Sequence, residues 1–446
     1  MTDSRLDTTS GLFTDLYELT MMQSYFDRGM DDPAAFSLFV RRLPATRNFL
    51  LVCGIDAVLD GLERLRFCDG DIAYLASLDL FTEAFLDHLR GFRFTGQVHA
   101  VAEGSVVFAN EPIIEIVAPI GQGQLVETLV MNRVHVATVL ASKAVRVVTA
   151  ARGRAVIDFG ARRMHGLDAA LTAARAFHIA GVDATSNVLA GQRYAIPVSG
   201  TMAHSYIEAF DDEAEAFAAF TRSFPETVLL VDTYDTLAGV GKVIDLARRL
   251  GDAFKVRAIR LDSGDLCDLA IKSRGLLDAA GLDGVSIFAS GGLDESEIAR
   301  LLDRGAPIDG FGVGTAMGVS EDAPSLDLAY KLCAYAGRGR LKLSPGKPIL
   351  PGRKQVFRTE RGDVIARSGE TLPGRPLLRP VMQDGRRVPG TRDDLDAIRA
   401  RAAAEVAALP APVRALEPAA EPYPVDVSAD LAAYRDAVIA SLRHSS

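Results

Sequence analysis

The sequence has no C-x-x-C pair among its four cysteines, which are Cys53, Cys68, Cys267 and Cys333. A zinc site or a disulfide framework built on cysteine is therefore not expected. The 446-residue chain also has no block of like charges, and its net charge is -9. Because nucleic acids are bound by clustered Lys and Arg, these features argue against nucleic acid as a main partner. A local basic pocket for a small phosphorylated ligand remains compatible with this composition.

Long apolar segments are also scarce in this sequence. The N-terminus, MTDSRLDTTSGLF, has no apolar signal region. No apolar run approaches the ~18 residues that a membrane span needs. We therefore expect a reduced, cytoplasmic protein with no membrane partner.

Several catalytic and nucleotide-binding motifs are missing as well. The sequence contains neither H-E-x-x-H nor G-x-S-x-G. The stretch GVGKV at residues 239–243 lacks the first glycine and the Ser/Thr of a P-loop. If ATP is used by this protein, it is held in some other way.

A repeated pattern of strand and helix fills residues 155–315. Short apolar runs end in Gly, Asp, Ser or Thr, and segments such as 212–224 and 295–305 show helical spacing of apolar residues. Alternating strands and helices predict an α/β fold with parallel strands. About seven such units suit a barrel, either complete or incomplete, and the active site of such a barrel lies at the carboxyl ends of its strands. The runs are AVIDFG, AGVDATSN, IPVSGT, TVLLVDTY, VRAIRLDSG, VSIFASGG and IDGFGVGT.

The two flanks of this region have a different pattern. Residues 93–118 and 335–390 show short β-strand patterns separated by turn residues. We expect the flanks to pair into one second α+β domain, with the Ala/Pro-rich stretch 404–426 on its surface. The predicted segments are 1–125 for the N-terminal part of that domain, 126–330 for the barrel with the active site, and 331–446 for the C-terminal part.

The motif IRLDSGDL places Arg260, Asp262 and Asp265 at the end of a predicted buried strand. Carboxylates and hydroxyls in this position suit the hydroxyl groups of a ribose, and Arg260 suits a planar anion held by two hydrogen bonds. The alternative is a solvated loop in which Ser263 or Asp262 caps the next helix. The combination of Arg, two Asp, Ser and Gly264 favours the binding site.

Two glycine-rich loops follow consecutive late strands, in FASGGLDES and FGVGTAM. Backbone N–H groups in such loops bind phosphate, with help from the dipole of the helix that follows. The alternative is that these are turn glycines with positive φ. Two such loops in succession, where barrels commonly bind phosphate, favour the phosphate site. The candidate contacts are Ser290, Gly291, Gly292, Gly312 and Gly314.

The motif DFGARRMHG places Phe159 beside Arg162, Arg163 and His165. A protein-kinase site is excluded because the other kinase motifs are absent. An aromatic face with two arginines at a strand end fits an aromatic ring stacked near a phosphorylated sugar. A surface salt-bridge patch is the alternative explanation of the arginines.

With these motifs placed, the chain resembles the nicotinate phosphoribosyltransferase family over nearly its whole length. Only the Ala/Pro-rich tail lacks a diagnostic motif. The resemblance rests on GLFTDLYELTMMQSYF, FVRRLPATRNFLLVCG, DFGARRMHG, GVDATSNVLAG, IPVSGTMAHS, IRLDSGDL, FASGGLDE, FGVGT and YKLCAYAGRGRLKLSPGKPILPGRKQVFR.

The resemblance implies a fold and a reaction. The fold is the incomplete α/β barrel of type II phosphoribosyltransferases, with a second α+β domain built from both chain termini. The reaction converts nicotinate and 5-phosphoribosyl 1-diphosphate into nicotinate mononucleotide and diphosphate, in the salvage route to NAD. It further implies coupling to ATP through a phosphohistidine, Mg²⁺ as cofactor, and a homodimer with sites near the interface.

The resemblance also assigns roles to residues of the nicotinate site. His204 matches the phosphohistidine, whereas the residue alone would be explained as a helix-start histidine of the core. Thr201 and Arg260 match nicotinate contacts, and Asp183 is placed near the ring. Phe159 stacks on one face of nicotinate, and Tyr17 stacks on the other from a neighbouring subunit. Packing of its own helix is the alternative explanation of Tyr17.

The contacts with 5-phosphoribosyl 1-diphosphate follow from the same motifs. Asp262 and Asp265 hold either the waters of the metal or the ribose hydroxyls, and the sequence does not choose between them, so the metal ligands stay unassigned. Thr315 matches a contact of the family. The full set is Arg162, Asp262, Ser263, Gly264, Asp265, Ser290, Gly291, Gly292, Gly312, Gly314 and Thr315.

Four alternative functions remain at this stage. Nicotinamide phosphoribosyltransferase has the same fold but a neutral substrate. Quinolinate phosphoribosyltransferase needs no ATP, and the intact GTMAHS counts against it. A phosphate-binding barrel isomerase or aldolase would need a Schiff-base lysine or a Glu/His pair at a strand end, and none is found. A nucleotide sensor without catalysis would not need the intact loop around His204.

Overall fold

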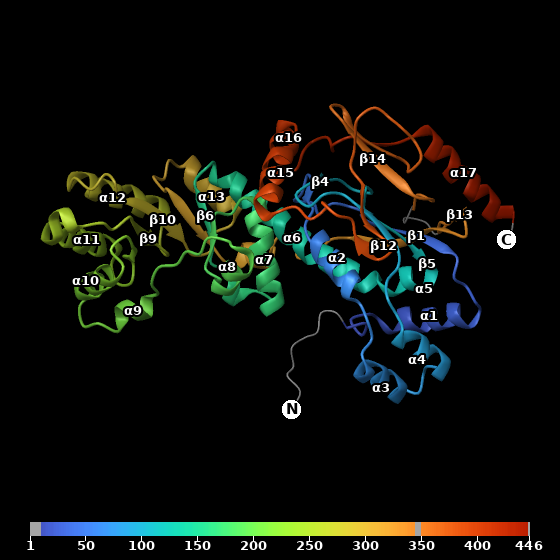
Figure 1. Ribbon diagram of the computed structural model, residues 1–446. Coiled ribbons are helices and arrows are strands. Elements are labelled where there is room, and N and C mark those ends of the chain that lie inside the picture. The colour runs from blue at the N-terminus through green and yellow to red at the C-terminus, as the bar shows by residue number, and fades with distance from the viewer. Residues whose placement is uncertain (1–9, 344–348, 445–446) are drawn as a thin grey trace. The chain divides into compact units, whose positions relative to one another are not determined.

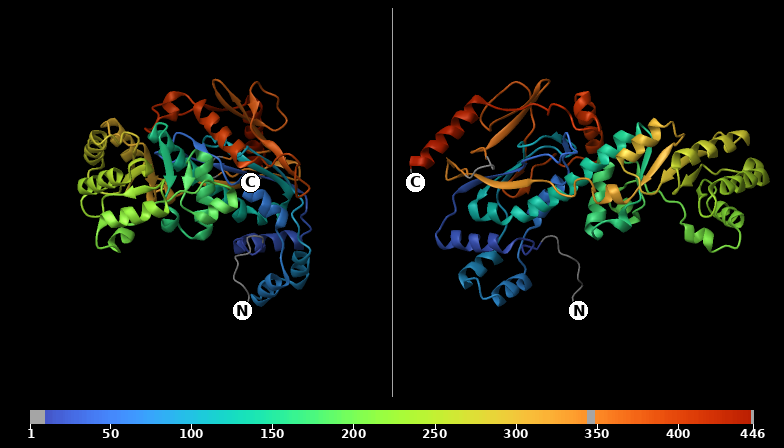
Figure 2. Two further views of the ribbon diagram at one scale, coloured as in Figure 1. Left: turned by 60° about the vertical axis from the view of Figure 1, so that its left-hand side comes forward. Right: turned by 180° about the vertical axis from the view of Figure 1, so that it is seen from behind.

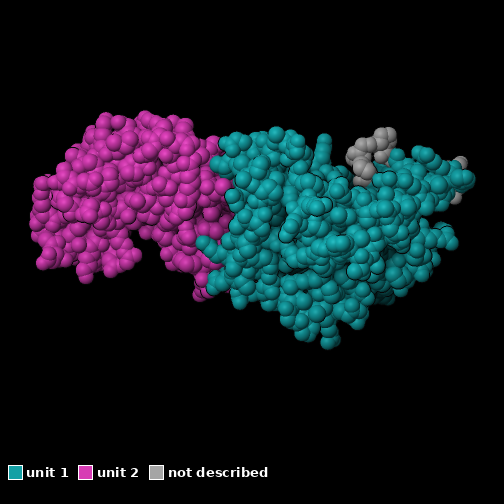
Figure 3. All heavy atoms as spheres, turned by 90° about the horizontal axis from the view of Figure 1, so that it is seen from above, with its two compact units in different colours: residues 1–139, 325–446 teal, residues 140–324 magenta. Residues whose placement is uncertain are grey.

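The computed structural model describes residues 10–343 and 349–444. It divides the chain into two compact units, coloured separately in Figure 3. One unit contains residues 1–139 and 325–446, and the other contains residues 140–324. The divisions predicted from the sequence lie at 125/126 and 330/331. The first differs because the 25-residue helix α6 (Glu127–Ala151) begins in one unit and ends in the other.

A sheet of six parallel strands forms the centre of the 140–324 unit, as predicted for an incomplete barrel. The strand order is β7-β6-β11-β10-β9-β8, so the sheet is open between β7 and β8. The strands are β6 (Ala155–Asp158), β7 (Ala184–Thr185), β8 (Val228–Leu230), β9 (Ala258–Leu261), β10 (Ser286–Ser290) and β11 (Gly310–Val313).

Six of the seven predicted strand runs form strands, and the run IPVSGT does not. It contributes only an isolated parallel bridge between Thr185 and Val198, beside β7. Pro197 has no N–H to donate to a ladder, although its carbonyl accepts a hydrogen bond from Thr185 at 3.0 Å. The segment therefore lies along the open edge of the sheet and leads directly into Ser199, Gly200 and Thr201.

Helices follow most strands of this unit, and aspartates begin four of them. Asp212, Asp235, Asp265 and Asp294 each accept a hydrogen bond from a backbone N–H of the first turn. Each such cap stabilises a helix by about 1 kcal/mol. Figure 1 shows α10, α11 and α12 side by side. The helices are α7 (Leu167–Ala180), α8 (Val188–Tyr194), α9 (His204–Glu208), α10 (Glu213–Ser223), α11 (Thr236–Leu250), α12 (Leu266–Ala279), α13 (Glu295–Asp303) and α14 (Thr315–Gly318), with the 3-10 turns η1 (Ala161–Arg163) and η2 (Gly251–Ala253).

Strands from both chain ends share one sheet in the other unit, which confirms the predicted second domain. Its seven-stranded sheet has the order β13-β12-β1-β5-β3-β17-β18, and β1 pairs antiparallel with both β5 and β12. Figure 2 shows the N-terminal and C-terminal strands lying together. Its strands are β1 (Pro33–Val40), β3 (Gln97–Ala100), β5 (Pro112–Pro119), β12 (Leu328–Tyr335), β13 (Arg338–Gly339), β17 (Arg379–Gln383) and β18 (Arg386–Arg387).

Two smaller sheets and a set of helices complete this unit. A four-stranded sheet has the order β16-β14-β15-β19, in which β15 and β19 run parallel, and β2 pairs with β4. These strands are β2 (Leu50–Leu51), β4 (Val106–Val107), β14 (Lys354–Thr359), β15 (Gly362–Arg367), β16 (Arg375–Pro376) and β19 (Val425–Val427). The helices are α1 (Leu16–Asp27), α2 (Ile55–Arg64), α3 (Asp69–Ser77), α4 (Glu83–Arg90), α5 (Ile120–Leu125), α15 (Leu395–Ala407), α16 (Ala411–Arg414) and α17 (Ala429–His444).

One helical stretch corrects the expectation that no segment is long and apolar enough to span a membrane. Within the described residues, the stretch Ile120–Ala151 meets both criteria, with a mean hydropathy of 1.3 in its most apolar window. Of that window, 72% is buried inside the protein. The core helix of a globular protein meets the same criteria, so length and composition here do not by themselves indicate a membrane span.

Candidate active site

Polar side chains gather at the carboxyl edge of the parallel sheet in the 140–324 unit. Parallel strands all end at the same edge, so the residues that follow them lie near one another. The residues that follow strands β6, β8, β9 and β10, or end them, are Phe159, Asp232, Thr233, Asp262, Ser263 and Ser290, and the segment after Val198 adds Thr201 and His204.

Asp262 contacts two other predicted site residues at this edge. Its Oδ1 accepts a short hydrogen bond from the hydroxyl of Ser290, at the end of the neighbouring strand β10. Its Oδ2 lies 3.8 Å from Nε2 of His204. The structure therefore brings together three residues that the sequence analysis placed in different motifs.

Asp232, which the sequence analysis did not single out, holds this loop in place. Its Oδ2 accepts hydrogen bonds from the backbone N–H of Asp262 at 2.8 Å and from Oγ of Ser263 at 2.6 Å. Its Oδ1 is buried and has no protein partner. A buried carboxylate oxygen without a partner is costly, so this atom points to a missing ligand at the edge of the sheet. The signal was present in the sequence, because Asp232 ends a strand run as Asp262 does.

His204 is the first residue of helix α9 and is held by one hydrogen bond. Its Nδ1 lies 3.1 Å from Oγ1 of Thr233, a further residue that the sequence analysis missed. The side chain is 39% exposed. The imidazole is therefore oriented between Thr233 and Asp262, while part of the ring remains open to a reactant.

Arg260 projects from β9 and uses two of its donors on the loop that precedes His204. Nη1 donates to Oγ1 of Thr201 at 2.7 Å, and Nη2 donates to the carbonyl of Met202 at 3.0 Å. Its guanidinium carbon lies 5.8 Å from the centre of the Phe159 ring, within cation–π range. The predicted nicotinate contacts Phe159, Thr201 and Arg260 are therefore neighbours.

The electrostatics of this corner leave a partly buried cation without full compensation. Burial lowers the pKa of Arg260, and the positive charge of Arg162 acts in the same direction, against Asp262 and Asp232. The Nε of Arg260 is buried without a hydrogen-bond partner. The guanidinium stays charged because its ordinary pKa is above 12. An anion bound beside it would stabilise this charge.

The position of the Phe159 ring explains one of the predicted phosphate-loop glycines differently. Gly312 lies inside β11, and a Cβ atom at this position would be 2.4 Å from the Phe159 ring. Glycine is therefore required so that the ring can lie across the strand. Asp158 stabilises the backbone around Phe159, because its two carboxylate oxygens accept hydrogen bonds from the N–H of Gly160 and the hydroxyl of Thr185. The expectation that Gly312 binds phosphate is corrected, because the ring covers it.

Gly314 and Thr315 remain accessible at the end of the same strand. Thr315 is exposed and is the first residue of the four-residue helix α14. Gly314 is its N-cap and has no side chain to accept from the first-turn N–H groups. The first turn of α14 therefore has no side-chain cap, at the edge where a phosphate was predicted.

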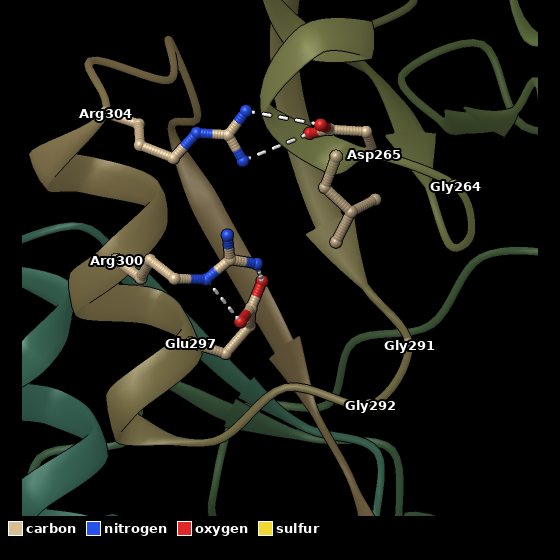
Figure 4. Close-up of a pocket in the computed structure, with 8 residues that line it drawn as sticks. Gly264, Asp265, Gly291, Gly292, Glu297, Arg300 and Arg304 are labelled. Carbon is tan, nitrogen blue, oxygen red and sulfur yellow. Dashed lines mark hydrogen bonds and ion pairs between the residues drawn. The ribbon is translucent and has the colours of Figure 1, made fainter.

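A polar pocket of about 410 Å³ lies between the β9–α12 loop and the β10–α13 loop. Gly291 has a φ of +88°, and a Cβ atom there would be 1.9 Å from the carbonyl oxygen of Asp262, so only glycine fits. Because the two loops approach so closely at Gly291, they form one side of the pocket together. The pocket is lined by Gly264, Asp265, Leu266, Gly291, Gly292, Glu297, Arg300 and Arg304. Figure 4 shows Arg300 projecting from α13 and Arg304 from the C-terminal end of that helix.

The carboxylate of Asp265 is engaged within the protein, which corrects its expected role at the ribose or the metal. It caps α12 by accepting from the N–H groups of Cys267 and Asp268. Its two oxygens also pair with Arg304 at 3.3 and 3.2 Å, as Figure 4 shows. The hydrogen bond from Arg304 lowers the pKa of Asp265. Asp265 is therefore the cap of α12, a role that the alternative explanation of this motif gave to Ser263 or Asp262.

Asp183 is not brought to the cluster. Its carboxylate accepts a hydrogen bond from the N–H of Val156 at 2.9 Å. This contact joins the start of β7 to β6 before the carboxyl edge is reached, because Ala184 and Thr185 pair with Ile157 and Asp158. The predicted contact of Asp183 with the nicotinate ring is therefore not supported by its position.

Tyr17 lies on α1, in the unit formed by the two chain ends, and is 46% exposed. Burial raises the pKa of its hydroxyl, and the charges of Glu127 and Glu18 add to this. Glu18 is fully buried, with one oxygen bonded to Thr14 and the other to Thr128. Burial raises the pKa of Glu18 to about 7. The hydroxyl of Tyr17 is hydrogen-bonded to Glu127, and much of the surface of this residue is exposed.

The described residues contain no group of three or more His, Cys, Asp or Glu side chains arranged to hold a metal ion. Asp232 and Asp262 are the carboxylates at the sheet edge that retain free oxygen lone pairs. Two protein carboxylates are what Mg²⁺ commonly takes when substrate phosphates supply the other ligands. A resident metal site built by the protein alone is not formed by these residues.

Comparisons with known proteins agree on one family. The model described as nicotinate phosphoribosyltransferase (NAPRTase) N-terminal domain matches residues 12–135. The model of the nicotinate phosphoribosyltransferase (NAPRTase) family matches residues 155–367, and that of the nicotinate phosphoribosyltransferase C-terminal domain matches residues 353–435.

Individual relatives carry the same name. The chain is 54% identical over 422 residues to "Nicotinate phosphoribosyltransferase pncB2" of Mycobacterium tuberculosis, covering 94% of this chain and 91% of that protein. It is 40% identical to the nicotinate phosphoribosyltransferase of Bacillus subtilis, covering 84% and 79%. The crystal structure of human nicotinic acid phosphoribosyltransferase superposes with a TM-score of 0.85 at 29% identity, covering 95% of this chain and 99% of that one.

Proposed function

Since the chain belongs to the nicotinate phosphoribosyltransferase family, we propose that this nicotinate phosphoribosyltransferase of NAD salvage couples ATP hydrolysis to its reaction through a phosphohistidine at His204. Its substrates are nicotinate and 5-phosphoribosyl 1-diphosphate. The proposal for the coupling rests on one observation above all. His204 lies beside Asp262, on the same sheet edge as the cation Arg260.

The nicotinate site in this proposal is the corner formed by Arg260, Thr201 and Phe159. The carboxylate of nicotinate accepts from Arg260, which satisfies the partly compensated cation. The ring of nicotinate lies against the ring of Phe159. The Phe159 ring in turn lies across Gly312, which has no side chain to obstruct it. A neutral amide would leave the charge of Arg260 without a partner, which favours nicotinate over nicotinamide as the substrate.

The diphosphate substrate in this proposal occupies the ends of β9, β10 and β11. Ser263 and Ser290 place their hydroxyl groups at this edge. The backbone N–H groups of the first turn of α14, which begins at Thr315, are donors for a phosphate. Arg162 is exposed close to Arg260 and adds positive charge. In the reaction, the ring nitrogen of nicotinate forms a bond to the anomeric carbon of the ribose. The bond from that carbon to the diphosphate oxygen breaks, and diphosphate leaves.

Magnesium fits the carboxylates of this edge as a substrate-bound ion. The Oδ1 of Asp232 is buried without a partner, and Asp262 has oxygens facing the same edge. When bound, the ion supplies Lewis-acid charge stabilisation to the diphosphate. Asp232 and Asp262 would hold it, while Asp232 continues to orient the backbone of Asp262. Asp265 is left out of this set because Arg304 occupies it.

His204 is the residue to which we assign the ATP coupling. A neutral imidazole nitrogen attacks the γ-phosphorus of ATP, the bond to the ADP oxygen breaks, and a nitrogen–phosphorus bond forms. Thr233 orients the ring through Nδ1, and its 39% exposure gives the nucleotide access. Water later cleaves the phosphohistidine and releases phosphate.

Steady-state assays test the proposed function directly. With 5-phosphoribosyl 1-diphosphate and Mg²⁺ present, we expect turnover of nicotinate to exceed that of nicotinamide by at least about tenfold, because only the acid satisfies Arg260. ATP is expected to raise the rate with nicotinate and to be hydrolysed in the process. Equal turnover of both substrates would contradict the assigned specificity. A rate that ATP leaves unchanged, with no ADP formed, would contradict the coupling.

We expect Tyr17 to contribute its ring to an active site that is shared between the two subunits of a homodimer. An aromatic stack contributes about 0.5–1.5 kcal/mol beyond the burial of area. Tyr17→Ala should therefore raise the KM for nicotinate several-fold, whereas Tyr17→Phe keeps the ring and should change it little. The initial rate as a function of nicotinate concentration is the measurement.

Mixing two impaired variants tests whether the ring of Tyr17 comes from a second subunit. Chains carrying Tyr17→Ala and chains carrying His204→Ala are combined and allowed to exchange subunits. If sites are shared, each heterodimer has one site with both residues intact, and ATP-coupled activity at low nicotinate returns. If a mixture shown to contain heterodimers has an ATP-coupled activity at low nicotinate no higher than the average of its two parents, the shared site is ruled out.

A further inference from the structure

A buried lysine on α6 is connected to both phosphate-loop helices of the 140–324 unit. The side chain of Lys143 is 2% exposed, and its Nζ lies 2.5 Å from Oε2 of Glu295 and 2.9 Å from Oδ1 of Asp322. One turn further along α6, Nε of Arg146 lies 2.8 Å from Oε1 of Glu295. Two cations and two carboxylates thus form one neutral network below the surface.

The two carboxylates belong to the two loops that follow β10 and β11. Glu295 is the first residue of α13, directly after the loop that contains Gly291 and Gly292. Asp322 follows α14, the short helix that Thr315 begins. One ammonium group therefore anchors the far end of both loops that the proposed function assigns to the diphosphate substrate.

The chain around Asp322 is otherwise a strained turn. Ser320 is buried with a left-handed φ of 48°, and its Oγ donates to the carbonyl of Ala323 at 2.9 Å. A non-glycine residue in this conformation needs support from its surroundings. The contact between Lys143 and Asp322 lies two residues from it and supplies a long-range tie.

Lys143 is the cation that contacts both carboxylates of this network. Burial raises the pKa of Glu295, but hydrogen bonds from Lys143 and Arg146 outweigh burial and keep the pKa below its ordinary value. Without the ammonium group, the carboxylates of Glu295 and Asp322 would lose the cation that both of them contact. Repulsion between the two carboxylates would then move the start of α13 away from the turn after α14.

We propose that Lys143 is a positioning residue for the phosphoribosyl diphosphate site, and that it acts by holding the β10–α13 and β11–α14 loops at a fixed separation. This inference rests on the proposed function, in which these loops bind the diphosphate substrate. Lys143 itself does not touch the substrate, because both of its partners lie on the far side of the loops. Nicotinate contacts Arg260, Thr201 and Phe159, which the network does not touch.

The test compares Lys143→Met with Arg274→Met. Arg274 lies on α12 of the same unit and donates to the carbonyls of Leu282 and Val285, at the opposite, amino edge of the sheet. Both changes remove a cation that ties a helix to a loop, and both should lower the Tm. Only Lys143→Met should raise the KM for 5-phosphoribosyl 1-diphosphate, by about tenfold or more, because misplaced binding groups lose that much. The KM for nicotinate should stay within about twofold in both variants.

Asp322→Asn is a milder second variant, since it keeps the pair of Lys143 and Glu295. It should raise the same KM by a smaller factor, and it keeps the inference testable if Lys143→Met does not fold. An unchanged KM for the diphosphate substrate in a folded variant with a lowered Tm would overturn the inference, as would an equal rise in Arg274→Met. If the unmodified enzyme shows no saturable use of 5-phosphoribosyl 1-diphosphate with nicotinate, the proposed function fails and takes the inference with it.

Discussion

His204→Ala is expected to form no phosphoenzyme and to lose ATP hydrolysis by at least about a hundredfold, as removal of a nucleophile does. The imidazole is the nucleophile in the proposed coupling, and the described residues around it, Thr233 and Asp262, do not replace it. Transfer without ATP should survive in part at high nicotinate, because Arg260 and the phosphate loops remain. Incubation with γ-labelled ATP followed by an acid-lability test measures the phosphoenzyme.

Two further variants serve as a control and as a test of the hydrogen bond that orients His204. His88→Ala removes an exposed histidine of α4 that packs on Phe26, in the other unit, and should retain full labelling. Thr233→Val keeps the nucleophile but removes the hydrogen bond to Nδ1, so labelling should be slower without being lost. Acid-labile label that persists in His204→Ala would show that another residue carries the phosphoryl group.

Arg260→Ala is expected to cost the enzyme about 2–5 kcal/mol in its interaction with nicotinate, the range for a buried charge pair that loses one partner. The expected result is a fall in kcat/KM for nicotinate of more than about tenfold, since 1.4 kcal/mol corresponds to a factor of ten. Turnover of nicotinamide should change much less, because the neutral amide does not use the charge. Arg260→Lys keeps the charge but loses the planar guanidinium group. Its kcat/KM for nicotinate should therefore lie between the values of Arg260→Ala and the unmodified enzyme.

Arg257→Ala is the matched control for Arg260. Arg257 directly precedes β9, is 71% exposed and pairs with Glu226 at the amino edge of the sheet. Its loss should leave the kinetics of both substrates unchanged. If Arg260→Ala is equally silent, the contacts of Arg260 with Thr201 and Met202 serve only the structure of the loop.

Most of the architecture could be predicted because it depends on local patterns. Buried parallel strands require apolar runs, and the polar residues that follow them must lie at one edge, so an α/β barrel and its active edge followed from spacing. That the barrel is incomplete was implied by the family resemblance. The run IPVSGT failed as a strand for a local reason too, because Pro197 cannot donate to a ladder. The second domain was predicted from the β-strand patterns of both flanks, and the pairing of β1 with β12 confirms it.

The partners of individual side chains could not be predicted, because they depend on contacts between residues far apart in the chain. Asp262 and Asp265 are three residues apart and look equivalent in IRLDSGDL, yet one faces His204 and the other is taken by Arg304, which lies 39 residues further along. Gly312 looked like a phosphate contact until the ring of Phe159 was seen to cover it. Thr233 and Lys143 carry no motif of their own, and only the folding of distant segments onto one sheet gives them partners.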